Sequence, residues 1–379
     1  MRERSSEQVR EVQQVATQRT VLVMAAGTGG HVFPALAIAR QLQQLGAKVE
    51  WLGTRRGMEN ELLANSGMYI HHIAVSGLKG SGIKRQLLAP FMLINALIQS
   101  LRVISKVRPD CVLGMGGFIC GPGGIATKLL AKPFLIHEQN AVAGTTNRLL
   151  ARFADCILEA FPDTFKGRGR IIYTGNPIRA EIVQLHTEPR VEIDPQRPLR
   201  ILVLGGSQGA AAINRVIPAA LSRWRQTQMP EIWQQTGKQS IAETLASYAA
   251  NGLQISAQCR VEPFITDMAN AYRWADLVIC RSGASTVSEL TAAGLPAILI
   301  PYPHHSDQQQ LHNANWLVKG GAAKLLEQAQ MTTDSLLDLI VALDGNRAQL
   351  QQMAAAARTM ANCNASAVIA NICLEYANA

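Results

Sequence analysis

The chain has 379 residues, of which 48% are hydrophobic and 17% are charged, a composition that excludes a disordered protein. Its formal net charge of +9 suits anionic partners, but the lysines and arginines are dispersed without interleaved aromatic residues, which argues against nucleic-acid binding. The seven cysteines include no Cys-x-x-Cys pair, so neither a disulfide framework nor a zinc knuckle is indicated, and reduced thiols in a cytosol are expected.

The length predicts two domains, each large enough to bury its own core. Residues 1–18 are polar, without the apolar core of a signal peptide, and are interpreted as an N-terminal extension. Over 19–187 and again over 199–361, apolar strand-like runs alternate with helical stretches, which predicts parallel sheets built from βα units. Residues 188–198 are rich in proline and charge and are interpreted as the linker. The expected strands include Val21–Met24, Val49–Leu52, Ile70–Ala74, Val112–Leu113, Phe134–Ile136, Ile157–Leu158, Ile171–Tyr173, Glu231–Gln234, Gln258–Val261, Leu277–Cys280 and Ala297–Ile300.

The first strand leads into a glycine-rich turn at residues 26–30, followed by His31. Such a turn exposes backbone N–H groups and the positive end of a helix dipole, and glycine lets a phosphate or sugar approach closely. The turn is not a dinucleotide fingerprint, because Val32 stands where that motif needs glycine. Histidine changes charge near neutral pH, so His31 could act as a general base; helix capping or substrate hydrogen bonding are equal alternatives.

A basic stretch precedes an apolar one before the second glycine-rich turn. Peripheral membrane proteins present basic residues beside an apolar stripe to an anionic bilayer. An ordinary core helix is the alternative, because its apolar residues have the same spacing. No apolar stretch reaches the roughly 18–20 residues that a spanning helix needs. The residues expected in this membrane patch are Lys79, Lys84, Arg85, Leu87, Leu88 and Phe91.

Two further glycine-rich turns lie at residues 114–117 and 205–210, each after an apolar segment. With the first turn, they suggest two nucleotide-type α/β domains that face a common cleft. Residues 137–140 (His-Glu-Gln-Asn) lack the second histidine of a zinc-protease helix, and are interpreted as a strand end that delivers polar side chains to a ligand. A plain hydrogen-bond network in a loop is the alternative. The chain contains no Gly-x4-Gly-Lys-Ser/Thr motif, which argues against an ATPase.

Residues 281–289 follow the predicted strand Leu277–Cys280 and are mostly small or hydroxylated up to Glu289. Ser285 or Thr286 could cap the next helix and donate to a phosphate, which the helix dipole attracts. Glu289 could accept both hydroxyls of a ribose. The alternative is a capping box in which Glu289 is a solvated acid of the first helical turn.

The polar loop at residues 303–310 could contact sugar hydroxyls. His304, His305 and Asp307 are metal-ligand types, but no convincing fourth ligand accompanies them, and no metal is expected.

A series of ordered motifs between residues 19 and 376 resembles those of the MurG family, the bacterial N-acetylglucosaminyltransferases that convert lipid I to lipid II in peptidoglycan synthesis. These motifs are Gly-Thr-Gly-Gly-His-Val-Phe-Pro-Ala-Leu-Ala (27–37), Gly-Met-Gly-Gly-Phe (114–118), Gly-Pro-Gly-Gly (121–124), His-Glu-Gln-Asn-Ala-Val-Ala-Gly (137–144), Gly-Asn-Pro-Ile-Arg (175–179), Gly-Gly-Ser-Gln-Gly-Ala (205–210) and Arg-Ser-Gly-Ala-Ser-Thr-Val-Ser-Glu (281–289).

The resemblance implies a GT-B fold with two Rossmann-like domains, in which a C-terminal helix at 362–379 returns to the N-terminal domain. It implies a UDP-GlcNAc site with Ile265 holding the uracil through its backbone, Glu289 the ribose and Gln310 the sugar. The loop before the paired glutamines differs in length by one residue, so Gln309 is an alternative to Gln310. The implied donor-site residues are Thr28, Gly29, Gly30, Asn140, Arg179, Ser207, Ile265, Ala284, Ser285, Thr286, Val287, Ser288, Glu289 and Gln310.

By the same resemblance, the enzyme inverts the sugar configuration, uses no cofactor or metal, and has His31 as the candidate base. Gly116, Gly117 and Gly123 would receive the diphosphate of lipid I. The implied location is peripheral, on the cytoplasmic face of the bacterial inner membrane, an anionic surface, with cell-wall synthesis or division proteins as candidate partners. The alternatives are another GT-B enzyme, such as a nucleotide-sugar epimerase, and a protein that binds nucleotide sugars or membranes without catalysis.

Overall fold

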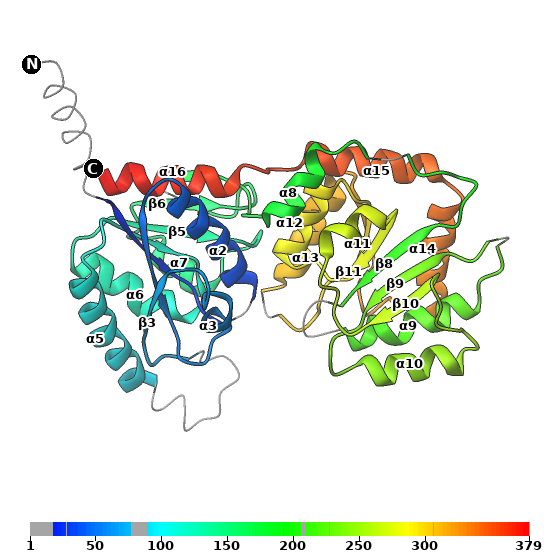
Figure 1. Ribbon diagram of the computed structural model, residues 1–379, viewed down its shortest axis with the longest axis horizontal. Coiled ribbons are helices and arrows are strands. Elements are labelled where there is room, and N and C mark those ends of the chain that lie inside the picture. The colour runs from blue at the N-terminus through cyan, green and yellow to red at the C-terminus, as the bar shows by residue number, and fades with distance from the viewer. Residues whose placement is uncertain are drawn as a thin grey trace, which may run out of the picture. The chain divides into compact units, whose positions relative to one another are not determined.

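The computed structural model describes residues 18–378, apart from residues 28, 77–88, 168, 191, 206–209, 227 and 306. Within these residues the chain forms two parallel sheets, one of seven strands and one of six, each joined by helices (Figure 1). This confirms the predicted α/β class with two parallel sheets.

The first sheet has the strand order β3-β2-β1-β4-β5-β6-β7. Its inner strand β1 pairs in parallel with β2 and β4, and the apolar residues of β1 are buried on both faces, as expected for a sheet covered by helices on both sides. The elements along this part of the chain are β1 (Thr20–Met24), α2 (Gly29–Gln44), β2 (Lys48–Gly53), α3 (Glu59–Leu62), β3 (Tyr69–His72), α5 (Ala89–Val107), β4 (Cys111–Gly114), α6 (Gly117–Leu129), β5 (Phe134–Glu138), α7 (Thr145–Leu150), β6 (Cys156–Glu159) and β7 (Ile171–Tyr173).

The second sheet has the order β10-β9-β8-β11-β12-β13, with β8 and β11 at its centre. Apolar side chains of these strands and of the covering helices form the core clusters on both faces. The elements are α8 (Ala180–Thr187), β8 (Arg200–Leu204), α9 (Ala211–Ser222), β9 (Glu231–Gln235), α10 (Ile241–Ala250), β10 (Cys259–Glu262), α11 (Met268–Trp274), β11 (Leu277–Cys280), α12 (Ala284–Ala293), β12 (Ala297–Leu299), α13 (Gln309–Lys319), β13 (Ala323–Leu325), α14 (Thr333–Asp344), α15 (Arg347–Thr359) and α16 (Ala365–Asn378).

Contacts within the chain divide it into two compact units. The first unit contains residues 1–137, 145–158 and 367–379, so most of α16 belongs with it. The second unit contains residues 138–144 and 159–366. Residues 159–187, which the sequence grouped with the N-terminal domain, therefore belong with the second unit, and they bring Arg179 to the helices of that unit.

The segment predicted as a linker is fastened to the second unit by arginines. Arg190 donates to the carbonyl oxygens of Ala293 (3.1 Å) and Ala275 (2.6 Å), and Arg197 forms a two-pronged ion pair with Asp276. Burial lowers the pKa of the Arg190 guanidinium to about 10. Arg190 thus caps the carbonyl ends of α11 (Met268–Trp274) and α12 (Ala284–Ala293), and both arginines anchor the segment on the second unit.

Among the described residues, no helix combines the length and the apolar character required to cross a bilayer.

Candidate active site

Two helices of the first unit begin at glycine-rich turns that lie close together. Helix α2 starts at Gly29 and carries His31, and α6 starts at Gly117 after the N-cap residue Gly116. Gly116 and Gly117 have φ of +88° and +74°, a backbone region that favours glycine. A Cβ on Gly117 would lie 3.5 Å from His31 Cδ2, so the imidazole lies beside the amino end of α6. An imidazole next to helix amides can serve both proton transfer and anion binding.

The turn before α2 is held by a buried carboxylate that sequence reasoning missed. Glu59 Oε1 accepts hydrogen bonds from the backbone N–H (2.7 Å) and the hydroxyl (2.9 Å) of Thr54, and Oε2 accepts from Gly27 N–H at 3.4 Å. Glu59 is fully buried. It therefore ties the loop after β1 to the loop after β2. A glutamate on a four-residue helix has no motif that would reveal this role.

Gly123 has a different role from the one predicted. It is buried inside α6, where a Cβ would lie 2.4 Å from Met24 Sδ and 3.3 Å from Leu52 Cδ2. The residue allows α6 to pack closely on β1 and β2. The prediction that Gly123 receives a diphosphate is therefore wrong, because its surroundings are packed core.

In the second unit, α12 begins directly after β11 with an uncapped amino end. Its N-cap residue Gly283 is extended and offers no side chain to the first amides. The Ser285 hydroxyl oxygen is buried without a hydrogen-bond partner. Ser288 donates back to the Ala284 carbonyl (3.0 Å), and the Val287 side chain is in the core. Among the predicted small and hydroxylated residues, Ser285 thus has a buried hydroxyl that lacks a protein partner at this helix end.

Glu289 lies on α12 beyond the first turn, and its carboxylate is nearly buried. Arg179 Nε donates to Oε1 at 2.8 Å, and the Tyr272 hydroxyl donates to Oε2 at 3.0 Å. Burial lowers the pKa of the Arg179 guanidinium, but the hydrogen bond and charge of Glu289 outweigh it and leave the pKa raised. The structure thus brings Arg179 and Glu289 together as an ion pair and excludes the solvated capping-box alternative. Tyr272 was missed by sequence reasoning.

The loop after β5 is connected to the same helix end through Asn313. The Asn313 amide accepts from Ala141 N–H (2.8 Å) and donates to Asn140 Oδ1 (3.2 Å) and to the Ser282 carbonyl (3.1 Å). Glu138 accepts from the backbone and side-chain amides of Asn140. Residues 137–140 are therefore the end of β5 and the start of a hydrogen-bonded loop, which positions Asn140 beside the start of α12. Asn313 gave no sequence signal because its partners lie far away in the chain.

Ile265 is buried, and its backbone N–H donates to Gln235 Oε1 at 2.9 Å. A base that used this N–H would have to displace the Gln235 side chain. Both candidate glutamines have side-chain partners: Gln310 Oε1 accepts from Tyr302 N–H (2.9 Å), and Gln309 Nε2 donates to Asp307 (3.1 Å). These contacts therefore do not distinguish Gln309 from Gln310 as the residue that binds the sugar.

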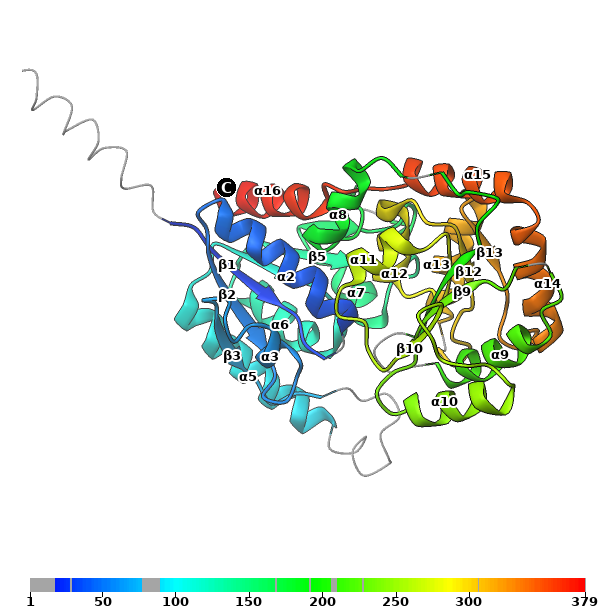
Figure 2. The ribbon, with the colours of Figure 1, turned by 45° about the vertical axis from the view of Figure 1, so that its right-hand side comes forward.

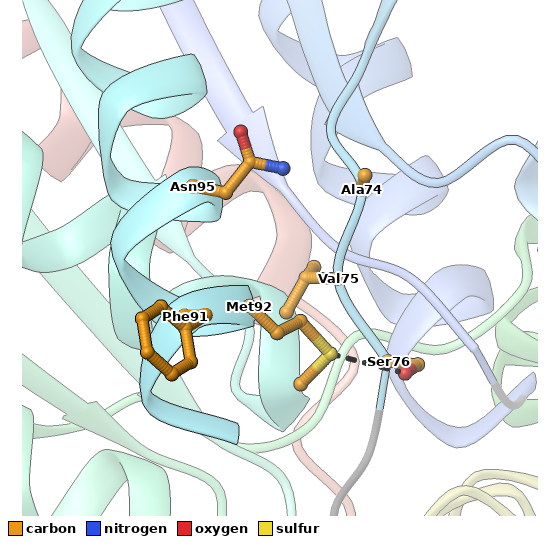
Figure 3. Close-up of a pocket in the computed structure, with 6 residues that line it drawn as sticks. All are labelled: Ala74, Val75, Ser76, Phe91, Met92 and Asn95. Atoms are coloured by element: carbon orange, nitrogen blue, oxygen red, sulfur yellow. Dashed lines mark hydrogen bonds between the residues drawn. The ribbon is translucent and has the colours of Figure 1, made fainter. Parts of the chain in front are cut away.

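Several predicted residues lie outside the described part of the chain: Thr28, Ser207, Lys79, Lys84, Arg85, Leu87 and Leu88. Phe91 is described, and 72% of its surface is exposed on α5. It lines a groove of about 590 Å³ between α5 and residues 74–76, shown in Figure 3, where Met92 points toward Ser76. In the described residues, His304, His305 and Asp307 do not gather into a group that could hold a metal.

Curated relatives match this chain along nearly its whole length. A protein of Azotobacter vinelandii named UDP-N-acetylglucosamine--N-acetylmuramyl-(pentapeptide) pyrophosphoryl-undecaprenol N-acetylglucosamine transferase is 51% identical over 357 residues, covering 94% of this chain and 98% of the relative. A protein of the same name from Pseudomonas savastanoi pv. phaseolicola is 48% identical over 358 residues, covering 94% and 99%.

Family models and a solved structure agree with these relatives. The models for the glycosyltransferase family 28 N-terminal and C-terminal domains match residues 21–159 and 200–369. The crystal structure of Acinetobacter baumannii MurG is 41% identical, with a TM-score of 0.78, over 94% of this chain and 99% of that one. The chain is therefore a family 28 glycosyltransferase of the GT-B fold class. Within that class, it belongs to the MurG family.

Proposed function

We propose that this chain transfers GlcNAc from UDP-GlcNAc to the 4-hydroxyl of the MurNAc residue in lipid I, which gives lipid II. The observation that carries the proposal is the 51% identity, over 94% of the chain, to a relative named for this transfer. The relatives and the MurG structure favour this reaction over the epimerase alternative.

The proposed contacts to the diphosphate and ribose of the donor are on the second unit, around the amino end of α12. The unpartnered Ser285 hydroxyl and the uncapped amides of α12 suit the diphosphate, and the buried Glu289 carboxylate suits the ribose. Asn140 is held next to this helix end by Asn313. The remaining proposed donor contacts are those that the family resemblance implies: Thr28, Gly29, Gly30, Arg179, Ser207, Ile265, Ala284, Thr286, Val287, Ser288 and Gln310.

In the proposed reaction, the acceptor hydroxyl oxygen attacks the anomeric carbon of GlcNAc from the side opposite UDP. The new C–O bond forms as the bond between that carbon and the phosphate oxygen breaks, which inverts the configuration. The hydroxyl proton passes to His31, and UDP leaves with the bonding electrons. The open amides of α12 would stabilise the charge on the departing diphosphate, and the turn at Gly116 and Gly117 would bind the acceptor diphosphate.

The test of the reaction is transfer of labelled GlcNAc from UDP-GlcNAc to a short-chain lipid I analogue. The wild type should form the disaccharide product, and Glu289→Ala should lose most of the kcat/KM. Glu243→Ala, which removes an exposed carboxylate on α10, should leave transfer unchanged. Conversion of UDP-GlcNAc to a C2 epimer without transfer would support an epimerase. Donor binding without any turnover would support a binding protein, and either result contradicts the proposal.

If His31 is the general base, replacing it should slow the chemical step of the transfer. Replacing a general base lowers the rate by roughly 100-fold or more, so His31→Ala should reduce kcat by that order while the affinity for UDP stays the same. His72→Ala, at an exposed histidine of β3, is the matched control. A kcat within about threefold of the wild type in His31→Ala would remove His31 from this role.

We also propose that the first unit binds the anionic cytoplasmic surface of the inner membrane, through α5 and the basic stretch before it. The support is an apolar exposed face on α5, where Phe91 is 72% and Ile94 is 56% exposed, beside the groove at residues 74–76. Amphipathic helices with exposed apolar residues enter the interface of a bilayer. Proteins of cell-wall synthesis or division remain candidate partners.

The double variant Phe91→Ser, Ile94→Ser should release the protein from vesicles that contain anionic lipid in a sedimentation assay. Leu245→Ser, at a partly exposed residue of α10 in the second unit, should leave vesicle binding unchanged. Unchanged binding of the double variant would exclude this face as the membrane contact.

A further inference from the structure

Three helices of the second unit meet at the Glu289 carboxylate: α8, which begins after Arg179, α11 with Tyr272, and α12 with Glu289 itself. The three helices lie side by side in both views (Figures 1 and 2), and α8 contacts both of the others. Helix α11 is fixed at its start by Asp267, whose carboxylate accepts Asn270 N–H at 2.9 Å. Tyr272 therefore extends from a helix whose first turn is held by a side-chain cap.

The hydrogen bonds at Glu289 are divided evenly between its two oxygens. Oε1 accepts the single Nε proton of Arg179, and Oε2 accepts the single hydroxyl proton of Tyr272. Each oxygen of an ionised carboxylate has about two acceptor positions. Each oxygen thus keeps one position for a ligand, which matches a pair of adjacent hydroxyls.

Tyr272 can act only as a donor at this place. It is buried in the core, and burial together with the negative charge of Glu289 raises the pKa of its hydroxyl well above the usual value. The phenol therefore stays protonated at neutral pH, and its hydroxyl donates to Oε2 at 3.0 Å. Without it, the Glu289 carboxylate could rotate about its last bond, because Arg179 holds only the other oxygen.

We propose that Tyr272 is a positioning residue that orients the Glu289 carboxylate for the two ribose hydroxyls of the donor nucleotide, and so makes the site selective for ribose over deoxyribose. This inference rests on the proposed donor site. A site built to hydrogen-bond a hydroxyl discriminates against ligands that lack it, and it loses that discrimination when the acceptor is no longer fixed.

The experiment measures affinities for UDP, 2′-deoxy-UDP and 3′-deoxy-UDP by calorimetry, using the full chain. The variant is Tyr272→Phe, which removes the hydroxyl and keeps the ring in the core. The matched control is Tyr248→Phe, because the fully buried Tyr248 hydroxyl also donates one hydrogen bond, to Gln234 at 2.7 Å, in the same unit. The two variants should therefore show similar losses of melting temperature.

The wild type should bind UDP more tightly than either deoxy analogue. In Tyr272→Phe, the preference for UDP over at least one analogue should fall by about three- to tenfold, the range expected for the net contribution of one ordinary hydrogen bond. The KM for UDP-GlcNAc should rise with kcat unchanged, and Tyr248→Phe should keep the wild-type preference. If Tyr272→Phe still preferred UDP over both analogues as strongly as the wild type does, the role of Tyr272 would be overturned, but the proposed donor site would not. Failure of the wild type to bind UDP would overturn the proposed donor site as well.

Discussion

Glu59 shows how a single buried carboxylate can hold a glycine-rich turn in place. Its two oxygens accept three protein hydrogen bonds, from Thr54 and from Gly27, and no part of the residue is exposed. A carboxylate that accepts several hydrogen bonds in a buried place is stable only while all of its partners stay in position. The conformation of the first glycine-rich turn therefore depends on this side chain.

Glu59→Gln should destabilise the protein and disturb this turn. The amide keeps the shape, but its NH2 group must face either Thr54 or Gly27, both of which are donors there. We expect a loss of roughly 1.5–3 kcal/mol in the free energy of unfolding, measured with urea. Glu61→Gln, at an exposed residue of the same short helix, should change it by less than about 0.5 kcal/mol. Equal midpoints for the two variants would contradict the role of Glu59.

At the scale of residues, motifs in the sequence predicted candidate ligand contacts, but they gave no sign of the buried groups that hydrogen-bond to those residues. Glu289 was predicted from the pattern of residues 281–289 and Arg179 from the family resemblance, and the structure brings them together. Tyr272, Asn313 and Glu59 were missed because each is an ordinary residue type whose partners come from other elements. Hydrogen bonds between distant parts of the chain depend on the folded packing, and no local pattern encodes them.

At the scale of elements, most strands were predicted within one or two residues, and two of them, β7 and β11, with the observed bounds. Alternating apolar and helical runs are a strong local signal in a parallel sheet. The edge strand β13 was missed because it has only three residues, and two of them are only partly buried. Gly123 was assigned to a ligand because a glycine needed for helix packing looks the same in a sequence as a glycine in a binding turn.

Helix α6 offers a test of that distinction, because its glycines differ in their surroundings. A Cβ on Gly124 would lie 2.7 Å from Phe134 Cζ and 2.8 Å from Leu150 Cδ2, whereas a Cβ on Gly121 would have nothing within 4 Å. Gly124→Ala should therefore destabilise the protein by about 1–3 kcal/mol through overpacking. Gly121→Ala should stabilise it by up to about 1 kcal/mol, because alanine favours the helix. Urea midpoints that move in the same direction for both would contradict this packing.

At the scale of the whole molecule, the end of the chain completes the first unit. Most of α16 belongs to that unit, where Ile369 is fully buried and the Tyr376 hydroxyl donates to the Asp155 carbonyl at 3.1 Å. A hydrogen bond between Cys111 and Cys373, together with burial, raises the pKa of the Cys111 thiol well above its usual value. The central strand β4 and the last helix thus share a core, although they are far apart in sequence.

This arrangement predicts that a change in α16 unfolds the first unit while the second remains folded. Ile369→Asp places an unpaired carboxylate in the core, which costs several kcal/mol, comparable to the roughly 5–15 kcal/mol that stabilise a whole domain. Val368→Asp, at the neighbouring residue with 38% of its surface exposed, should have little effect. We expect Ile369→Asp to lose transfer activity and to unfold in two steps by calorimetry. The affinity for UDP should be largely retained, because the proposed contacts to the diphosphate and the ribose, Ser285 and Glu289, lie in the second unit. Loss of UDP binding together with activity would show that the two units unfold as one cooperative body.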